Sequence, residues 1–124
     1  MDRALYVCAG IAGFLGVALG AFAAHGLKTS LAPDLLAVFE TAVRYQMYHV
    51  FAIIAAGWAW ARWQHQAFAA AGALFVAGIV IFSGSLYLLA FTGTRWWGAI
   101  TPFGGLAFLT GWLCLAVGAM RAPR

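Results

Sequence analysis

The chain has 124 residues, of which 65% are hydrophobic and only 8% are charged. A soluble domain carries roughly a quarter charged residues. This composition therefore excludes a soluble domain and is typical of an integral membrane protein. The formal charge of +4 comes from basic residues scattered singly at segment ends, a pattern that does not favour nucleic-acid binding. Cys8 and Cys114 lie inside apolar segments without CxxC spacing, so neither a zinc site nor a disulfide framework is predicted.

Four apolar segments are each long enough to cross a bilayer, which takes about 20 residues. The expected spans cover residues 4–24, 42–61, 67–91 and 99–120, joined by short polar connections. The second helix is expected to begin near Leu31, so that its first part lies at the membrane interface. The predicted fold class is all-α, a polytopic four-helix transmembrane bundle that runs up-down-up-down as a single domain over residues 1–124.

Basic residues near the span ends predict the orientation. One side of the membrane would hold both termini and the second connection, with Arg3, Arg62, Arg121 and Arg124. The other side would hold only Lys28, Arg44 and Arg95, with Arg44 partly inside the membrane. The positive-inside rule therefore places both termini in the cytoplasm.

Small residues recur at every fourth position of the first span: Ala12, Gly16, Gly20 and Ala24. Such a stripe allows two helix backbones to approach closely in lipid, where packing replaces the hydrophobic effect as the driving force. We expect Gly16 and Gly20 to make the closest helix contact in the molecule.

Residues 39–49 form the only dense polar stretch of the chain. At 3.6 residues per turn its side chains form two rows, with Gln46 further round the helix: Glu40, Arg44 and Tyr48 in one row, Tyr45 and His49 in the other. Other helices have to cover so wide a polar face. Arg44 is therefore expected to turn into the bundle and to pair with Glu40 or with carbonyls or hydroxyls of a neighbouring helix.

The predicted topology brings polar residues of all four segments to the same end of the bundle. This candidate site consists of His25, Glu40, Arg44, Tyr45, Tyr48, His49, Ser83, Ser85, Tyr87 and Thr101. It is interpreted as a hydrogen-bonded network that fixes the helix register, with a ligand-binding cavity and a proton or metal path as alternatives. A cavity would open between the second, third and fourth helices and would prefer anionic groups such as a lipid phosphate, because Arg44 and Arg95 outnumber Glu40 there.

Four collinear motifs resemble a known family. They are Gly20–Lys28 (GAFAAHGLK), Phe39–His49 (FETAVRYQMYH), Phe82–Tyr87 (FSGSLY) and Ile100–Gly105 (ITPFGG). Together they are similar to the domain-of-unknown-function family 423, small bacterial inner-membrane proteins of the YgdD and YwdK types that are related to mitochondrial transmembrane protein 256. Ala23 departs from the first motif, where glycine is expected. The resemblance implies four transmembrane helices in a bacterial plasma membrane, and it implies no particular activity.

The leading functional hypothesis is a non-enzymatic accessory, membrane-stabilising or lipid-interacting component. Its expected partners are membrane lipids and either further copies of itself or a larger membrane complex, without nucleic acid. The alternative is an oligomeric carrier or channel for a small solute or protons, because four short helices leave little lumen in a monomer. An intramembrane enzyme is disfavoured, since no Ser/His/Asp order, HExxH motif or paired carboxylates occur. No catalytic residue, cofactor or metal is predicted.

Overall fold

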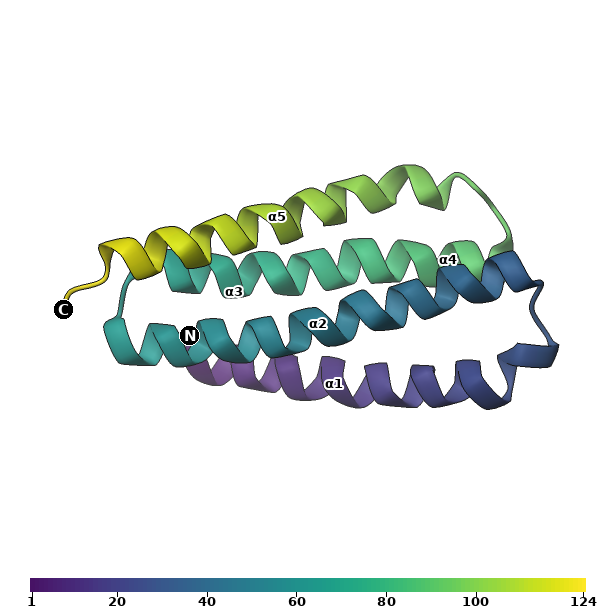
Figure 1. Ribbon diagram of the computed structural model, residues 1–124, viewed down its shortest axis with the longest axis horizontal. Coiled ribbons are helices and arrows are strands. Elements are labelled where there is room, and N and C mark those ends of the chain that lie inside the picture. Colours follow the sequence, from purple (N-terminus) through teal and green to yellow (C-terminus); the bar gives the residue numbers. More distant parts are fainter.

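The computed structural model describes residues 1–124 and is entirely helical, which confirms the all-α prediction. Successive helical rods run in opposite directions, so both termini lie at the same end (Figure 1). The elements are α1 (Asp2–His25), the short 3₁₀ turn η1 (Leu27–Thr29), α2 (Pro33–Trp63), α3 (Gln66–Gly78), η2 (Ile79–Ser83), α4 (Gly84–Thr92) and α5 (Trp97–Arg121). The elements α3, η2 and α4 form one continuous rod, called the α3–α4 rod below.

Three of these rods are long and apolar enough to cross a membrane: α1, the α3–α4 rod and α5. The rod α2 spans 31 residues but is less apolar than the other three. The reason lies in the first half of α2, where polar side chains such as Glu40, Arg44 and Gln46 interrupt the apolar sequence. The later half, from Val50 to Ala61, contains no charged residue.

The α3–α4 rod differs from the regular helix predicted for residues 67–91. Its middle segment, Ile79–Ser83, is a π-helix, in which each turn holds more residues than an α-turn. Ser83 is fully buried at the end of this segment, and its hydroxyl donates a 2.7 Å hydrogen bond to the carbonyl of Ala42 in α2. The π-helix therefore lies where the rod packs most tightly against its neighbours.

Glycines of α5 and aromatic rings of the α3–α4 rod interlock in one antiparallel register. Glycines at seven-residue spacing in α5 lie against phenylalanines at seven-residue spacing in the rod: Gly118 on Phe68, Gly111 on Phe75 and Gly104 on Phe82. The same register places Phe108 of α5 on Gly78. Gly118 and Gly111 lie against the rings and Gly104 against the backbone of Phe82, so the two helices pack at short distance.

The closest backbone approach occurs at Gly104, not at the stripe of α1. A Cβ atom at Gly104 would collide with the backbone nitrogen of Phe82 and would lie 2.7 Å from its Cα atom. The stripe does face α2, as expected, but Gly16 lies against the flexible side chain of Met47 and Gly20 against Val43. The prediction that this stripe makes the closest contact is therefore wrong, because side chains of α2 separate the two backbones.

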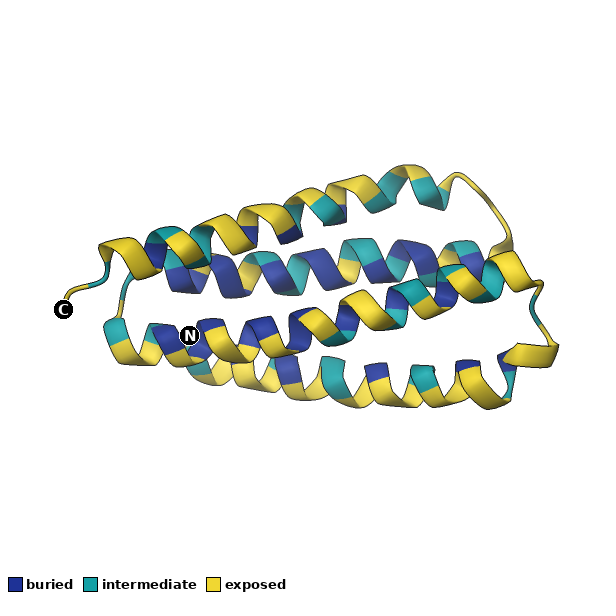
Figure 2. Cartoon of the chain, viewed as in Figure 1, coloured by how far each residue is buried: buried dark blue, intermediate teal, exposed yellow.

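The rod α1 is peripheral. It packs along α2 and reaches α3 only near its own start, where Leu5 lies against Gly72. Figure 2 shows the consequence, a helix whose buried residues are confined to one side. The main core is formed where all four rods meet, by Leu5, Ala9, Val50, Ala52, Ile53, Ala56, Ala71, Phe75, Ile79 and Phe108. Towards the other end, a groove lies between α1 and the α3–α4 rod.

Candidate functional site

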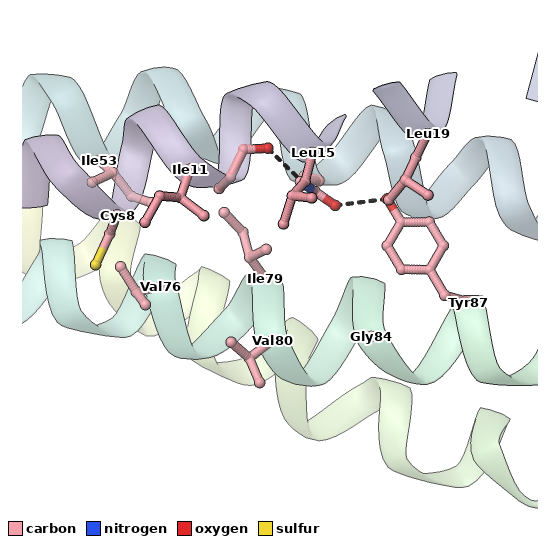
Figure 3. Close-up of a pocket in the computed structure, with 12 residues that line it drawn as sticks. Cys8, Ile11, Leu15, Leu19, Ile53, Val76, Ile79, Val80, Gly84 and Tyr87 are labelled. Carbon is pink, nitrogen blue, oxygen red and sulfur yellow. Dashed lines mark hydrogen bonds between the residues drawn. The ribbon is translucent and has the colours of Figure 1, made fainter. Parts of the chain in front are cut away.

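Gln46 is the polar centre of the interior. Its side chain is 3% exposed, its Nε2 atom donates a 2.7 Å hydrogen bond to the carbonyl of Ala12, and its Oε1 atom accepts a 2.6 Å hydrogen bond from the hydroxyl of Tyr87 (Figure 3). One amide therefore connects α1, α2 and α4. Because an unpaired amide in an apolar environment is costly, these two bonds fix the relative positions of three helices.

His49 occupies an aromatic box one turn further along α2. Its Nδ1 atom lies 2.7 Å from the carbonyl of Tyr45, and its Nε2 atom lies 3.1 Å from the indole Nε1 of Trp112. A carbonyl only accepts and an indole N–H only donates, so His49 is the neutral tautomer with its proton on Nδ1. The ring stacks on Phe108, with 3.5 Å between centroids and 10° between planes. If the Nε2 atom of His49 also carried a proton, its N–H group would face the indole N–H of Trp112, and neither group could accept the hydrogen bond.

The hydroxyl groups of the third and fourth segments complete the network. The hydroxyl oxygens of Ser85 and Thr101 are hydrogen-bonded at 2.6 Å. These two residues face each other in the same register as the glycine and phenylalanine pairs. Ser85 also bonds the carbonyl of Phe82, and Ser83 bonds that of Ala42. No buried side-chain nitrogen or oxygen in the protein lacks a partner. The interior polar residues therefore satisfy one another.

Five residues of the predicted cluster lie outside this network. His25, Glu40, Arg44, Tyr45 and Tyr48 are exposed at the surface of their helices. The predicted pairing of Arg44 is wrong, since its exposed side chain forms no hydrogen bond and the only ion pair in the protein joins the terminal amine to Asp2. The cause is the rotation of α2 about its own axis. Phe39, Ala42 and Gln46 face the other helices, which turns the row containing Glu40, Arg44 and Tyr48 outward.

Two residues of the network were not predicted as site residues. These are Gln46, which helix periodicity sets apart from the polar rows, and Trp112, which lies outside the dense polar stretch. The signal for Gln46 was its position among Phe39, Ala42, Val50 and Ile53, which share the buried side of α2 at helical spacing. No comparable signal marks Trp112, because its partner is 63 residues away in the sequence.

A groove of about 490 Å³ lies between α1 and the α3–α4 rod, above α2. Figure 3 shows apolar side chains pointing into it from both sides, including Ile11 and Leu15 of α1 and Val76, Ile79 and Val80 of the opposite rod. Ten of its twelve lining residues are hydrophobic, and Gln46 and Tyr87 bond each other. Gly84 leaves open space on its groove side, because a Cβ atom added there would meet no atom within 4 Å. The groove therefore presents an almost wholly apolar surface.

A second cavity, of about 520 Å³, lies at the end of the molecule away from the termini. It is formed by the start of α2, the end of α4 and the connection to α5, and it is lined by Asp34, Arg95 and apolar residues such as Leu35 and Leu89. Neither cavity is lined by Arg44, Tyr48 or His49. The concavity expected between the second, third and fourth helices is therefore not found at those residues.

Comparison with known proteins gives a consistent result. The family described as "Protein of unknown function (DUF423)" matches residues 19–105. The chain belongs to this family. It is 39% identical over 123 residues to the UPF0382 inner membrane protein YgdD of Escherichia coli K12, which covers 99% of this chain and 94% of that protein. It is 42% identical over 116 residues to a UPF0382 membrane protein of Staphylococcus saprophyticus, covering 86% and 88%. No solved structure matches.

The stretch that matches DUF423 contains most of the interior network. Gln46, His49, Ser83, Ser85 and Thr101 all lie within residues 19–105, whereas Trp112 lies beyond them. Together with three rods able to cross a membrane, the relatives show that this DUF423 protein is a multi-pass integral membrane protein. The names of the relatives assign no activity.

The bond between Trp112 and His49 leads to a prediction for this DUF423 protein. Replacing Trp112 with phenylalanine keeps an aromatic ring against His49 but removes the indole donor. The Nε2 atom of the buried His49 would then lack a donor, and we expect a loss of about 1 kcal/mol in the free energy of unfolding, at the low end of the cost of an unsatisfied buried group because Trp112 itself is 45% exposed. Unfolding in a mixed detergent series would measure it. An unchanged stability would mean that the bond does not order His49.

Proposed function

We propose that this DUF423 protein is a non-enzymatic, lipid-interacting component of the bacterial plasma membrane. In this proposal all four rods cross the bilayer, with both termini in the cytoplasm. The alternation of rod direction supports an even number of crossings, because it leaves both termini at one end (Figure 1). The apolar later half of α2 supports the fourth crossing, with its polar row near one interface.

The observation that carries the proposal is the apolar groove between α1 and the α3–α4 rod. A void in a membrane protein that opens towards the bilayer is unfavourable when empty, because its walls lose dispersion contacts. The material available to fill it is lipid hydrocarbon. Gln46 and Tyr87 bond each other at its floor, so an occupant needs no polar group there. We infer that the groove holds a lipid acyl chain.

The same geometry supports a non-enzymatic role. Catalysis by acids, bases or nucleophiles requires a polar group that is free to meet a substrate. In this protein each buried polar side-chain atom already has a hydrogen-bond partner, either another side chain or a backbone carbonyl. The neutral tautomer of His49 is held at both ring nitrogens, which also argues against that residue as a proton carrier. These features favour an accessory role over the transport alternative.

The experiment is to fill the groove from within. Gly84 lines it, and a Cβ atom added there would meet no atom within 4 Å, so we expect the side chain of Gly84→Leu to occupy part of the groove. Leucine also has a higher helix propensity than glycine, by up to about 1 kcal/mol, so the variant should remain folded. We expect native mass spectrometry to show fewer phospholipid molecules retained by Gly84→Leu than by the parent protein.

Gly105→Leu is the matched control. Gly105 also has open space around its Cβ position, but it belongs to α5 and lies outside the groove. We expect this variant to retain as much lipid as the parent. If Gly84→Leu is folded and retains as much lipid as Gly105→Leu, the groove does not bind lipid and the proposal loses its main support.

A further inference from the structure

We propose that the second cavity binds the headgroup of a zwitterionic phospholipid, with its phosphate at Arg95 and its ammonium group at Asp34. Both side chains line this one cavity, at the end of the molecule away from the termini. The inference rests on the proposed role in lipid interaction and names a lipid class and a place for its headgroup.

The charges in the cavity are the first argument. Asp34 and Arg95 share the cavity wall but form no ion pair with each other or with any other residue. Each charge is therefore free to bind a ligand. Arginine binds phosphate oxygens through two parallel N–H donors, and a carboxylate accepts hydrogen bonds from an ammonium group. A ligand that carries both groups would complement both side chains.

The apolar part of the wall is the second argument. Leu35, Val38 and Leu89 line the cavity beside the two charged residues. A small water-soluble zwitterion would leave these side chains without partners, whereas the glycerol and first acyl carbons of a phospholipid would cover them. The combination of two opposite charges and an apolar wall therefore fits a phospholipid better than a soluble metabolite.

The position of the cavity is the third argument. It lies where α2 begins, where α4 ends at Thr92 and where the connection leads into α5. Trp96 belongs to this connection and Trp97 begins α5, and tryptophan is enriched at the level of lipid headgroups. The cavity is thus placed at the depth of the headgroup layer when the rods cross the bilayer.

An anionic lipid would fit less well. Its phosphate would bond Arg95, but its headgroup would offer Asp34 no cationic partner. Phosphatidylethanolamine supplies three N–H donors for Asp34, and phosphatidylglycerol supplies none that carries charge. Asp34 is therefore the residue that distinguishes between the two lipids, and Arg95 is the residue that holds the phosphate common to both.

The test is competition between two lipids with identical acyl chains. Delipidated protein is incubated with equal amounts of phosphatidylethanolamine and phosphatidylglycerol, and native mass spectrometry gives the ratio of the two bound species. We expect the parent to prefer phosphatidylethanolamine by roughly two- to five-fold, the effect of one exposed charge pair. Asp34→Asn should remove this preference, whereas Arg95→Gln should reduce the binding of both lipids.

Glu40→Gln and Arg44→Gln are the matched controls, because they change the same charges on the same end of the molecule but lie outside the cavity. Both variants should keep the preference of the parent. The proposal is overturned if the parent shows no preference, if Asp34→Asn keeps it, or if the control variants lose it equally. Soluble glycerophosphoethanolamine that competes as well as the lipid would also overturn it.

The outcome is independent of the groove experiment. Gly84→Leu changes the total amount of retained lipid, whereas Asp34→Asn changes the ratio of lipid classes. If Gly84→Leu lowers retention and Asp34→Asn leaves the ratio unchanged, the headgroup site is wrong and the lipid-interacting function stands. If Gly84→Leu has no effect but Asp34→Asn shifts the ratio, the groove proposal is wrong and the headgroup site stands.

Discussion

Replacing Gly104 with alanine should lower the stability of the protein more than the same replacement at any other glycine. The new Cβ atom would collide with the backbone nitrogen of Phe82 and lie 2.7 Å from its Cα atom, and a backbone cannot rotate away as a side chain can. The helices α5 and η2 would have to separate. We expect a loss of at least about 1–3 kcal/mol in the free energy of unfolding, the usual cost of overpacking.

Gly105 is the control for this experiment. It is adjacent in the same helix, and a Cβ atom there would meet nothing within 4 Å. Gly105→Ala should therefore leave the stability unchanged or raise it by up to about 1 kcal/mol through helix propensity. Thermal unfolding in detergent would compare the two variants. Equal stability of Gly104→Ala and Gly105→Ala would show that α5 does not approach η2 as closely as described.

Replacing Gln46 with leucine should have the second largest effect. Leucine removes both hydrogen bonds of the buried amide and leaves the half-buried hydroxyl of Tyr87 without a partner. An unsatisfied buried polar group costs about 1–3 kcal/mol. We therefore expect a loss of stability of that size, measured by unfolding in a mixed detergent series. Thr41→Val, which removes a hydroxyl bonded only within α2, should change the stability by less than about 0.5 kcal/mol.

A double-mutant cycle separates the hydrogen bond from the packing. Tyr87→Phe removes the hydroxyl, so the variant with both Gln46→Leu and Tyr87→Phe leaves no unsatisfied side chain at this position. Replacing both partners of a hydrogen bond by apolar groups can be nearly neutral. The double variant should consequently be more stable than the sum of the single losses predicts, with a coupling energy of about 0.5–3 kcal/mol. Strict additivity would contradict a direct bond between the two residues.

The sequence was sufficient to predict the helical fold and the ends of the helices to within a few residues. Long apolar segments separated by short polar connections allow few other structures, because every backbone group in a bilayer has to be satisfied within its own helix. The convergence of polar residues at one end of the predicted bundle likewise indicated His49, Ser83, Ser85, Tyr87 and Thr101, all of which belong to the interior network.

What the sequence did not predict was the direction in which each helix faces. Arg44 and Gln46 are two residues apart, and helix periodicity alone does not decide which of them points inward. Charge suggested Arg44, but the buried side of α2 is the one that carries Gln46. The groove could not be predicted either, since it depends on the angle between α1 and the α3–α4 rod. Such angles result from side-chain packing between distant segments, not from local propensity.

The π-helix at Ile79–Ser83 sets the rotational phase of everything that follows it in the rod. An α-helix turns by about 100° per residue, so one residue more or less in this segment would rotate Gly84–Thr92 by that angle. Tyr87 would turn away from Gln46, Ser85 from Thr101, and Gly84 from the groove. This one π-helical segment thus determines that the side chains of the interior network and those of the groove wall face the correct neighbours. A shift in this phase would change both together, without altering any of the side chains that form them.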